Sequence, residues 1–545
     1  MSDNSNRKNS LVVQAGILAA AGIIVRIIGL LYNTPLVHII GDEGFGYYDS
    51  AYVAYSIVLL ISTYSIPSAV SKIISHRLAR GEYKNAYRIF KCTLGYVVVV
   101  GLISSLFVFF GAGILVKMES AILPLRILAP TIFFSGILGS FRGFFQAQRS
   151  MVQSSISQII EQIFNAGFSV GMAYVLVNVA KNSAPDKIAS YGAAGSTIGT
   201  GVGVLSGLAF MLLIFFYNKK DIMNKVYADK STVVLPYTDI VKMIFVVVTP
   251  FILSTAIYNV NSFMDKTIYQ IVLMKGKGIV ESEVAVDLSA FAKANKIANI
   301  PIAMASAMAS TLIPRLSGAI ATEDYASARE QVDRATRVTM FISIPAAVGI
   351  GVLAKPIMLV LFPQANSISL ASGMLIVLSA TVVLYGLSTL TQAVLQSIGH
   401  MNIPIINALI AVVVHAAIMV ALMVILPRGA ALYCYGGATI LYALLLCIFN
   451  GISVSKHLDY KQEIDKTFLR PIISSVAMGI VVFGVYQGLF VLIKSNIVSL
   501  FVAVIVGAIV YLVLCIKWKA INENELRAMP KGSFIVKICK RVKLL

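Results

Sequence analysis

The sequence contains 545 residues, of which 58% are hydrophobic and only 12% are Asp, Glu, Lys or Arg. Soluble domains usually contain about 25% charged residues, so this composition excludes an ordinary water-soluble protein. The formal net charge of +20 would suit a nucleic-acid-binding protein, but the basic residues are distributed as expected for a membrane protein.

Long apolar segments follow one another along nearly the whole chain. About 20 helical residues cross a bilayer core about 30 Å thick, and the chain accommodates about fourteen such segments. The predicted fold class is therefore an all-α polytopic membrane protein. We place the segments at 11–33, 45–71, 92–116, 121–147, 152–180, 190–217, 239–272, 286–314, 336–362, 368–398, 403–427, 430–455, 471–493 and 496–516.

Most Lys and Arg residues outside the segments fall on one side of the predicted membrane. Cytoplasmic loops carry an excess of Lys and Arg, so this side is predicted to be cytoplasmic, with both termini on it. The basic tail, residues 521–545, is expected to lie on anionic lipid. The basic loops on the same side are 72–91, 148–150, 218–230, 315–334 and 455–466.

Two halves of the chain resemble each other. Residues 77–91 align with 319–333 through an acid-Tyr-x-x-Ala pattern in a polar loop, and residues 131–151 align with 381–401. Segments 1 to 6 therefore match segments 7 to 12. Because six is an even number, both copies cross the membrane in the same direction. They are predicted to be related by a pseudo-two-fold axis along the membrane normal, which permits rocking between inward-open and outward-open states.

This repeat predicts four parts. Residues 1–225 form an N-terminal six-helix lobe, and residues 226–460 form a C-terminal six-helix lobe. Residues 461–520 hold two further segments, which either face lipid passively or form a groove for an acyl or isoprenoid chain. The basic tail, 521–545, completes the chain.

Several segments contain charged residues, which are costly in hydrocarbon and usually face protein or water. Arg26, Lys293 and Lys296 are the cations predicted to lie at bilayer depth. Lys293 and Lys296 are three residues apart and share a helix face. Three cations around one aqueous cavity would attract a di-anion such as pyrophosphate. Alternatively, Arg26 forms a structural ion pair and the lysines extend to the membrane interface.

Arg142 and Glu161 offer two interpretations as well. They bind substrate, or they pair across a helix hairpin as a structural clamp; Arg142 also lies close enough to the cytoplasmic end to anchor its segment.

Asp265 lies in a polar stretch with Asn259 and Asn261. Hard cations favour oxygen ligands, so this stretch is a candidate for Na⁺ or proton coupling. Asp265 would equally well neutralise the neighbouring Lys266.

No enzyme signature is present: the sequence lacks a Walker A motif, an HExxH motif and a nucleophile elbow. The five cysteines are scattered without metal-ligand spacing. We therefore expect a protein that is not an enzyme, with no metal site and no cofactor. Na⁺, protons or the membrane potential remain alternative energy sources.

Three short motifs point to a family. They are Arg-Ile-Ile-Gly at 26–29, Asp-Ser-Ala-Tyr-Val-Ala-Tyr at 49–55, and Ala-Asn-Lys-Ile-Ala-Asn-Ile-Pro at 294–301. In these motifs the sequence resembles the MurJ and SpoVB group of lipid-linked peptidoglycan precursor flippases. That group belongs to the multidrug/oligosaccharidyl-lipid/polysaccharide exporter superfamily. The chain departs from the family at Tyr32, where a second family arginine would stand.

The resemblance implies a flippase of the bacterial cell membrane. It would move an undecaprenyl-pyrophosphate-linked precursor, lipid II, from the inner to the outer leaflet by alternating access. Arg26 and Lys296 would bind the pyrophosphate with help from Lys293, and Asp49 would hold a closed gate by pairing with a cation. The implied partners are the precursor and membrane lipids, without nucleic acid, and a monomer suffices for this function.

Three alternatives stay open at this point. The first is a multidrug or cation antiporter of the same superfamily, although such exporters usually have twelve segments and acidic sites. The second is a flippase for a teichoic, capsular or spore-specific lipid-linked glycan. The third is a non-transporting scaffold for envelope synthesis, which the charges inside the segments disfavour.

Overall fold

The computed structural model describes residues 20–64, 66–148, 150–229, 231, 234–363, 366–521, 523 and 532–541. Within these residues the regular elements are helices and no strand occurs, so the all-α prediction is confirmed. The chain divides into two compact units, Met1–Ser289 and Ala290–Leu545, which we call the first and second units.

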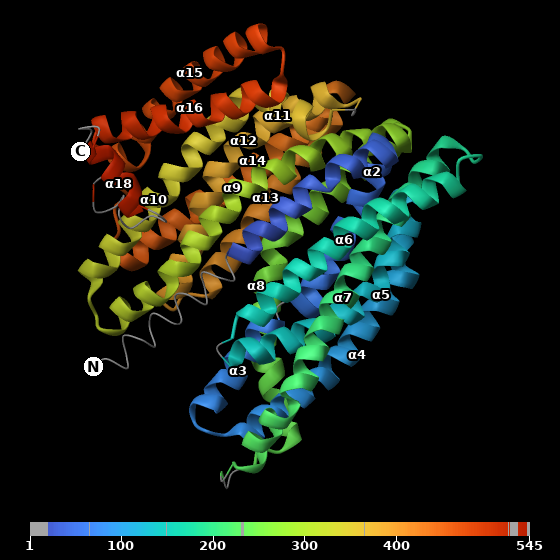
Figure 1. Ribbon diagram of the computed structural model, residues 1–545, viewed down its shortest axis with the longest axis vertical. Coiled ribbons are helices and arrows are strands. Elements are labelled where there is room, and N and C mark those ends of the chain that lie inside the picture. The colour runs from blue at the N-terminus through green and yellow to red at the C-terminus, as the bar shows by residue number, and fades with distance from the viewer. Residues whose placement is uncertain are drawn as a thin grey trace. The chain divides into compact units, whose positions relative to one another are not determined.

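The first unit is built from long apolar helices (Figure 1). A short helix, Ala20–Leu31, precedes them. The following elements are α2 (Asn33–Leu59), η1 (Leu60–Tyr64), α3 (Ile66–Ala79), α4 (Tyr83–Leu115), η2 (Glu119–Ala121), α5 (Ile122–Ala147), α6 (Val152–Val179), α7 (Pro185–Tyr227), α8 (Tyr237–Gln270), η3 (Ile271–Gly276) and the start of α9 (Glu281–Ala321).

The packing of the first unit follows from its small residues. α6 and α7 lie side by side (Figure 1) because glycines recur every fourth residue on α7. At Gly199, a Cβ atom would stand 2.2 Å from the backbone nitrogen of Ser169 on α6, so only glycine allows this approach. α5 packs against α3, α4 and α7, and α8 packs against α2, α3 and α4. α8 thus belongs to the first unit, while the predicted lobes 1–225 and 226–460 stay predictions.

The second unit contains the rest of α9 and the helices that follow it (Figure 1). α15 and α16 form a hairpin that packs against α10, and α12 contacts α10 and α14. These elements are α10 (Tyr325–Val352), α11 (Ala354–Leu361), α12 (Ile368–Ser397), α13 (Asn402–Ile425), α14 (Arg428–Leu458), η4 (Asp465–Leu469), α15 (Arg470–Ile493), α16 (Asn496–Lys517) and α18 (Gly532–Arg541).

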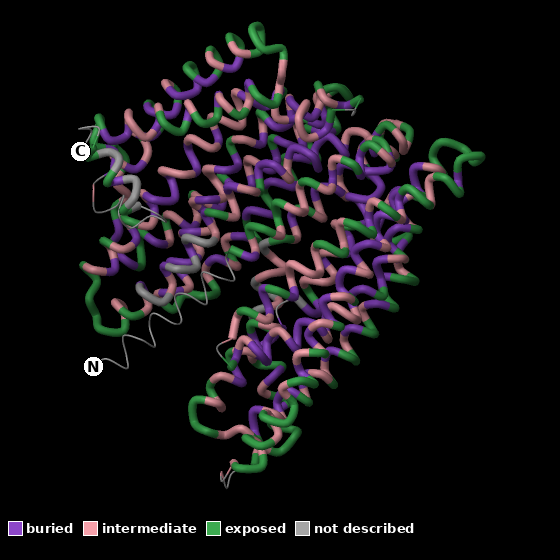
Figure 2. Tube along the Cα trace, viewed as in Figure 1, coloured by how far each residue is buried: buried purple, intermediate pink, exposed green. Residues whose placement is uncertain are grey.

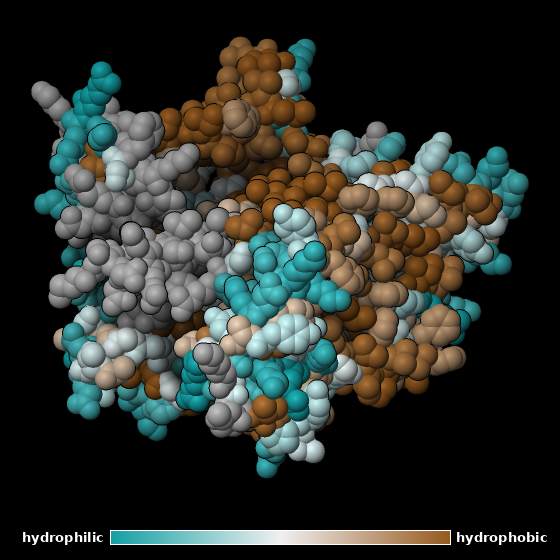
Figure 3. Space-filling model, turned by 60° about the horizontal axis from the view of Figure 1, so that its bottom comes forward, coloured by the Kyte–Doolittle hydropathy of each residue, from teal (hydrophilic) through white to brown (hydrophobic). Residues whose placement is uncertain are grey.

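The helices agree with the predicted membrane segments. Among the described residues, 11 helices are long and apolar enough to cross a membrane. The predicted segments 239–272 and 286–314 coincide with α8 and α9. Of segment 11–33, residues 20–31 form the helix Ala20–Leu31, and residues 11–19 lie outside the described residues. Large apolar side chains stay exposed on these helices, as Phe110 (76%) and Leu492 (80%) illustrate. In Figure 3 such side chains form broad brown patches, apart from clusters of hydrophilic side chains, as a lipid-facing surface requires.

Some predicted boundaries were wrong. The predicted segment 45–71 is part of a longer run, Asn33–Ala79, which bends at Gly41 (φ +69°) and passes through the π-turn η1. Glycine tolerates this backbone conformation, so the helix restarts immediately after it. The predicted segment 336–362 contains two helices, because the chain leaves helical geometry at Leu353.

The predicted tail lies only partly within the described residues. Its helix α18 does not rest on lipid alone, because Val536 is buried in a cluster with Ala520 and Ile521 at the end of α16. Lys540 also pairs with Glu523 at 2.9 Å. Burial in Figure 2 follows the inward faces of the helices in each unit, while the loop between α6 and α7 is exposed.

Candidate functional site

A buried ion pair joins α2 to α8. The Lys266 ammonium contacts Oδ2 of Asp49, and both residues are at least nine-tenths buried. The same ammonium also lies 3.3 Å from the backbone oxygen of Asp49. A single buried charge would cost several kcal/mol, so each of these residues requires the other in this arrangement. The cation that pairs with Asp49 is therefore Lys266.

Two hydrogen bonds surround this ion pair. The side-chain amide of Gln270 donates to the hydroxyl of Ser50 at 3.1 Å, one residue from Asp49. The hydroxyl of Tyr269 donates to Oδ2 of Asp287 at 2.8 Å, which connects α8 to the first turns of α9. Both α8 side chains are buried, and the bond between Gln270 and Ser50 is buried as well.

Glu281 makes a third connection at the same end of the helices. Its two carboxylate oxygens accept hydrogen bonds from the backbone nitrogens of Glu119 and Ser120, each at 2.9 Å. These nitrogens belong to the first two residues of η2, which leads directly into α5. The helix dipole favours a carboxylate at the start of a helix. A carboxylate 161 residues away in the sequence thus caps this turn.

Gly46 lets α2 approach the start of α9 closely. A Cβ atom at Gly46 would lie 2.0 Å from the backbone oxygen of Ala285, so no larger residue fits without movement. We call the set Gly46, Asp49, Lys266, Tyr269, Gln270, Glu281 and Asp287 the outer cluster, because the distribution of Lys and Arg predicts that this end faces outside.

Arg142 and Glu161 also form an ion pair, within the first six helices. The guanidinium lies 2.7 Å from Oε2 of Glu161 and donates to the hydroxyl of Ser157, connecting α5 to α6. The side chains are 13% and 28% exposed. This geometry is that of the predicted helix clamp, while a role in substrate binding stays a prediction.

The three predicted pyrophosphate ligands lie in different surroundings. Arg26 is exposed on the helix Ala20–Leu31 of the first unit. Lys293 is completely buried in the second unit, where its ammonium donates to the hydroxyl of Ser367 at 3.2 Å and lies 5.7 Å from the ring centre of Phe362. Lys296 is half-buried. The convergence of these cations on one cavity stays a prediction.

The predicted cation-coupling residues do not share one environment. Asp265 and Asn261 are buried and lie four residues apart, on one face of α8. Asn259 is exposed and donates to the backbone oxygen of Thr255 at 2.7 Å. In the part of the chain that the structure describes, no three His, Cys, Asp or Glu side chains are grouped to hold a metal ion.

Sequence reasoning missed most of the outer cluster. Lys266 entered it only as a neighbour of Asp265, and Gln270, Glu281 and Asp287 were not selected. One signal was available: Lys266 and Gln270 are four residues apart, so a helix places both on one face. No local pattern could have assigned Glu281 to a distant helix start.

An apolar cavity of about 460 Å³ lies in the second unit, between α10, α11, α15 and α16. Apolar side chains such as Ile342, Ile357, Met478 and Val504 line it. Tyr511 also lines it and uses its hydroxyl to donate to the backbone oxygen of Phe341 at 2.9 Å. Helices α15 and α16, the two extra segments of the sequence, therefore form part of the wall of an apolar cavity, while a groove for a lipid tail stays a prediction.

Comparison with known sequences identifies relatives over most of the chain. Lipid II flippase MurJ of Bacillus subtilis (strain 168) is 22% identical over 490 residues, which are 86% of each chain. Stage V sporulation protein B of the same organism is 24% identical over 534 residues, covering 94% of this chain and 96% of the relative. The predicted resemblance to the MurJ and SpoVB group is confirmed.

Solved structures share the fold. The inward closed conformation of Lipid II flippase MurJ superposes with a TM-score of 0.64 at 17% identity, covering 92% of this chain and 98% of that one. An inward-facing multidrug resistance transporter of the MATE family gives a TM-score of 0.61 at 17% identity, covering 80% and 99%. The fold is that of polytopic helical transporters, which confirms the predicted class of multi-pass membrane protein.

Family models match two parts of the sequence. The model described as MatE matches residues 266–421. The model described as Polysaccharide biosynthesis protein matches residues 11–320, more than half of the chain. The chain therefore belongs to the polysaccharide biosynthesis protein family.

Proposed function

We propose that this protein is a flippase that moves a lipid-linked glycan precursor with a pyrophosphate group from the inner to the outer leaflet. Lipid II is the first candidate substrate, because a relative of this length carries that function in its name. The observation that carries the proposal is the buried ion pair between Asp49 and Lys266, since a buried pair that spans two predicted repeats suits a gate that opens and closes.

The outer cluster would be the closed outer gate of the cycle. In the closed state Asp49 and Lys266 neutralise each other, and in the open state each charge would be solvated by water. In the closed state the attraction between the two charges offsets the cost of removing them from water. In the open state both charges are hydrated and this cost does not arise, so the two states would differ little in free energy. Alternating access requires two states of similar free energy, because the protein must populate both of them during the cycle.

The headgroup and the tail would use different parts of the protein. Arg26 and Lys296 would bind the pyrophosphate, with Lys293 assisting, because Arg offers a bidentate fork and Lys a mobile charge. The isoprenoid tail would lie in the apolar cavity beside α15 and α16. The membrane potential acting on the cations, at about 2.3 kcal/mol per charge per 100 mV, is the proposed driver.

Flipping in proteoliposomes tests this proposal. A fluorescent lipid-linked pyrophosphate sugar is incorporated, and its appearance in the outer leaflet is measured by quenching. Arg26→Ala and Lys296→Ala are expected to abolish flipping, whereas Lys296→Arg retains it. Lys181→Ala, which removes an exposed cation from the loop after α6, serves as the control. Full activity of both alanine variants would exclude the pyrophosphate clamp.

Export of a cationic drug is the second candidate function, because the MatE model matches residues 266–421. The same vesicles, loaded with a cationic dye, distinguish the two functions. Dye export without flipping would favour the antiporter. Loss of Na⁺-dependent thermal stabilisation in Asp265→Asn would favour ion coupling, whereas no Na⁺ effect in the parent protein would favour the membrane potential.

A further inference from the structure

A large cavity lies in the first unit, at the opposite end from the outer cluster. Its volume is about 890 Å³, which is within the range of small-molecule binding sites. The ends of α3, α4, α5 and α7 and one side of α8 enclose it. The loops that join these helices carry the excess of Lys and Arg, so this end is predicted to be cytoplasmic.

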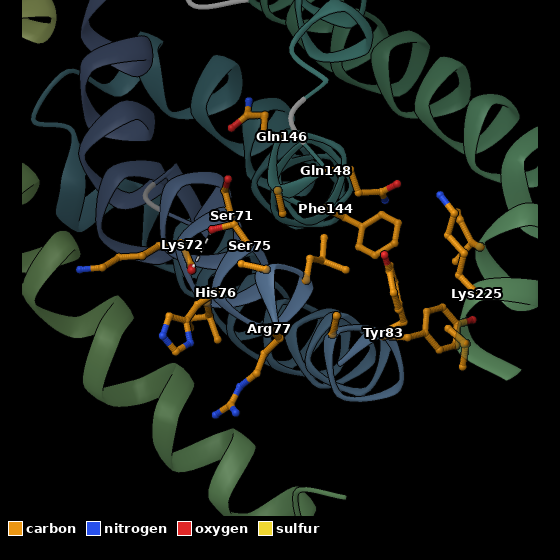
Figure 4. A pocket seen from close by; sticks show the side chains of 18 of the residues that line it. Ser71, Lys72, Ser75, His76, Arg77, Tyr83, Phe144, Gln146, Gln148 and Lys225 are labelled. Carbon is orange, nitrogen blue, oxygen red and sulfur yellow. Dashed lines mark hydrogen bonds between the residues drawn. The ribbon is translucent and has the colours of Figure 1, made fainter. Parts of the chain in front are cut away.

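Cationic residues, most of them exposed, lie at the rim of this cavity. Lys72, His76 and Arg77 come from α3, and Lys225 comes from α7. Figure 4 shows the three α3 residues on one side, with their side chains extending outward, and Lys225 on the other side, with Ser75, Phe144 and Tyr83 between them. Arg77 also pairs with Glu82 at 3.0 Å. Among the described residues that line the cavity none is Asp or Glu, so the cavity favours an anion.

The wall between these cations is apolar. Ile73, Phe144, Ile222 and Val247 line it from four different helices. A soluble phosphate has no apolar group that could contact this wall. A ligand with an anionic group and hydrocarbon chains matches both parts of the lining.

The depth of the cavity in the membrane agrees with such a ligand. α5 begins at Ile122, on the predicted outer side. About 20 residues at 1.5 Å each cross the hydrocarbon core. Lining residues Phe144 and Gln148, near the end of α5, therefore lie in the cytoplasmic headgroup layer. Val247 reaches a similar depth when α8 is counted from its outer end at Gln270.

We propose that this cavity binds the phosphate headgroup of an anionic phospholipid from the inner leaflet. Lys72 and Lys225 lie at opposite rims of the cavity, from which their long flexible side chains would reach the phosphate, and the acyl chains lie against the apolar wall. Basic pockets between transmembrane helices on the cytoplasmic side are suited to anionic lipid headgroups. Because the lipid contacts α3, α7 and α8 together, it stabilises the present arrangement of the first unit.

Binding to the purified full-length protein in detergent tests the proposal without a transport assay. The probe is a fluorescent phosphatidylglycerol, with unlabelled phosphatidylglycerol, phosphatidylcholine of the same chains and inorganic pyrophosphate as competitors. Unlabelled phosphatidylglycerol is expected to compete and to raise Tm, and the other two to compete at least tenfold less well. Lys72→Gln with Lys225→Gln is expected to weaken binding roughly tenfold or more, because two cations near the phosphate are lost.

The matched control is Lys84→Gln with Lys220→Gln. It removes the same charge from exposed lysines of α4 and α7 that do not line the cavity, and binding is expected to stay within about twofold. A second variant, Ser75→Trp, fills the cavity without changing charge and is expected to abolish probe binding.

Three results would overturn the proposal. Equal losses in the two lysine double variants would indicate general surface attraction. Competition by pyrophosphate as strong as that by the lipid would indicate a soluble-anion site. Unchanged binding in Ser75→Trp would place the lipid elsewhere. The transport proposal is separate, because Arg26→Ala is expected to keep full phosphatidylglycerol binding.

Discussion

The two ends of the first unit are packed differently. At the outer end, an ion pair, a helix cap and a glycine contact hold α2, α5, α8 and α9 together. At the cytoplasmic end, the helices that continue from the same bundle enclose a cavity of about 890 Å³. The first unit is therefore closed where it is predicted to face outside and hollow where it is predicted to face the cytoplasm. Closure at the outer end thus coincides with specific contacts between helices, both polar contacts and the backbone contact at Gly46.

Breaking the buried ion pair is expected to have the largest effect on this difference. Lys266→Met leaves the carboxylate of Asp49 buried without its cation, at a cost of about 3–5 kcal/mol. The outer end should open, so that a cysteine replacing the buried Leu288 reacts with an impermeant maleimide. Thermal unfolding in detergent measures the stability, and labelling of intact cells measures the opening.

Two further variants sharpen this experiment. Asp49→Leu combined with Lys266→Met removes both charges and should recover most of the lost stability. Glu161→Gln breaks the other ion pair, between α5 and α6, and should leave the labelling of Leu288→Cys unchanged. Increased labelling in Glu161→Gln would mean that the opening is not specific to the outer cluster.

Gly46→Ala is expected to have the second largest effect. Its Cβ atom would meet the backbone oxygen of Ala285, and such overpacking costs about 1–3 kcal/mol. The matched control is Gly95→Ala on α4, where no atom lies within 4 Å of the new Cβ atom. Helix propensity predicts that the control gains up to about 1 kcal/mol. Equal melting temperatures for the two variants would contradict close packing at the outer end.

Glu281→Gln should have a smaller effect, about 1 kcal/mol, because it removes the charge that caps η2 and leaves one oxygen to accept. Asp186→Asn is the control: it removes an exposed carboxylate from the first turn of α7 and should cost only a few tenths of a kcal/mol. Chemical unfolding with both variants measures the difference. A larger loss in Asp186→Asn would refute the importance of the distant cap.

The smallest effect is expected at the cytoplasmic end. Hydrogen bonding from Asn85 and then the guanidinium of Arg77 hold the pKa of Glu82 below its ordinary value. A lowered carboxyl pKa contributes stability above the ordinary pKa, and the contribution disappears as pH falls through the lowered one. Glu82→Gln should remove this dependence and change stability by well under 1 kcal/mol at pH 7. Melting curves between pH 3 and pH 7 (about the range of carboxyl titration) measure it.

The helices and their apolar faces could be predicted from the sequence, because hydropathy reports directly on the length that crosses a bilayer. The pairing of Asp49 with a cation was also predicted, as an implication of the resemblance to the flippase family. The identity of the cation that pairs with Asp49 could not be predicted. Lys266 is 217 residues away, and the sequence offered its neighbour Asp265 as a nearer partner. The cap by Glu281 and the contact at Gly46 depend on tertiary packing, which leaves no local pattern.

The ion pair has a consequence for the origin of the chain from two similar halves. In the repeat, Ser50-Ala51-Tyr52 matches Ser289-Ala290-Phe291, so Leu288 stands at the counterpart of Asp49. Two copies of the first half would lack Lys266 at this contact, and two copies of the second half would lack Asp49. Only unlike halves supply the opposite charges. Separately expressed halves are therefore expected to associate with each other more strongly than with copies of themselves. In this respect the chain resembles a heterodimer whose two subunits are joined in one polypeptide.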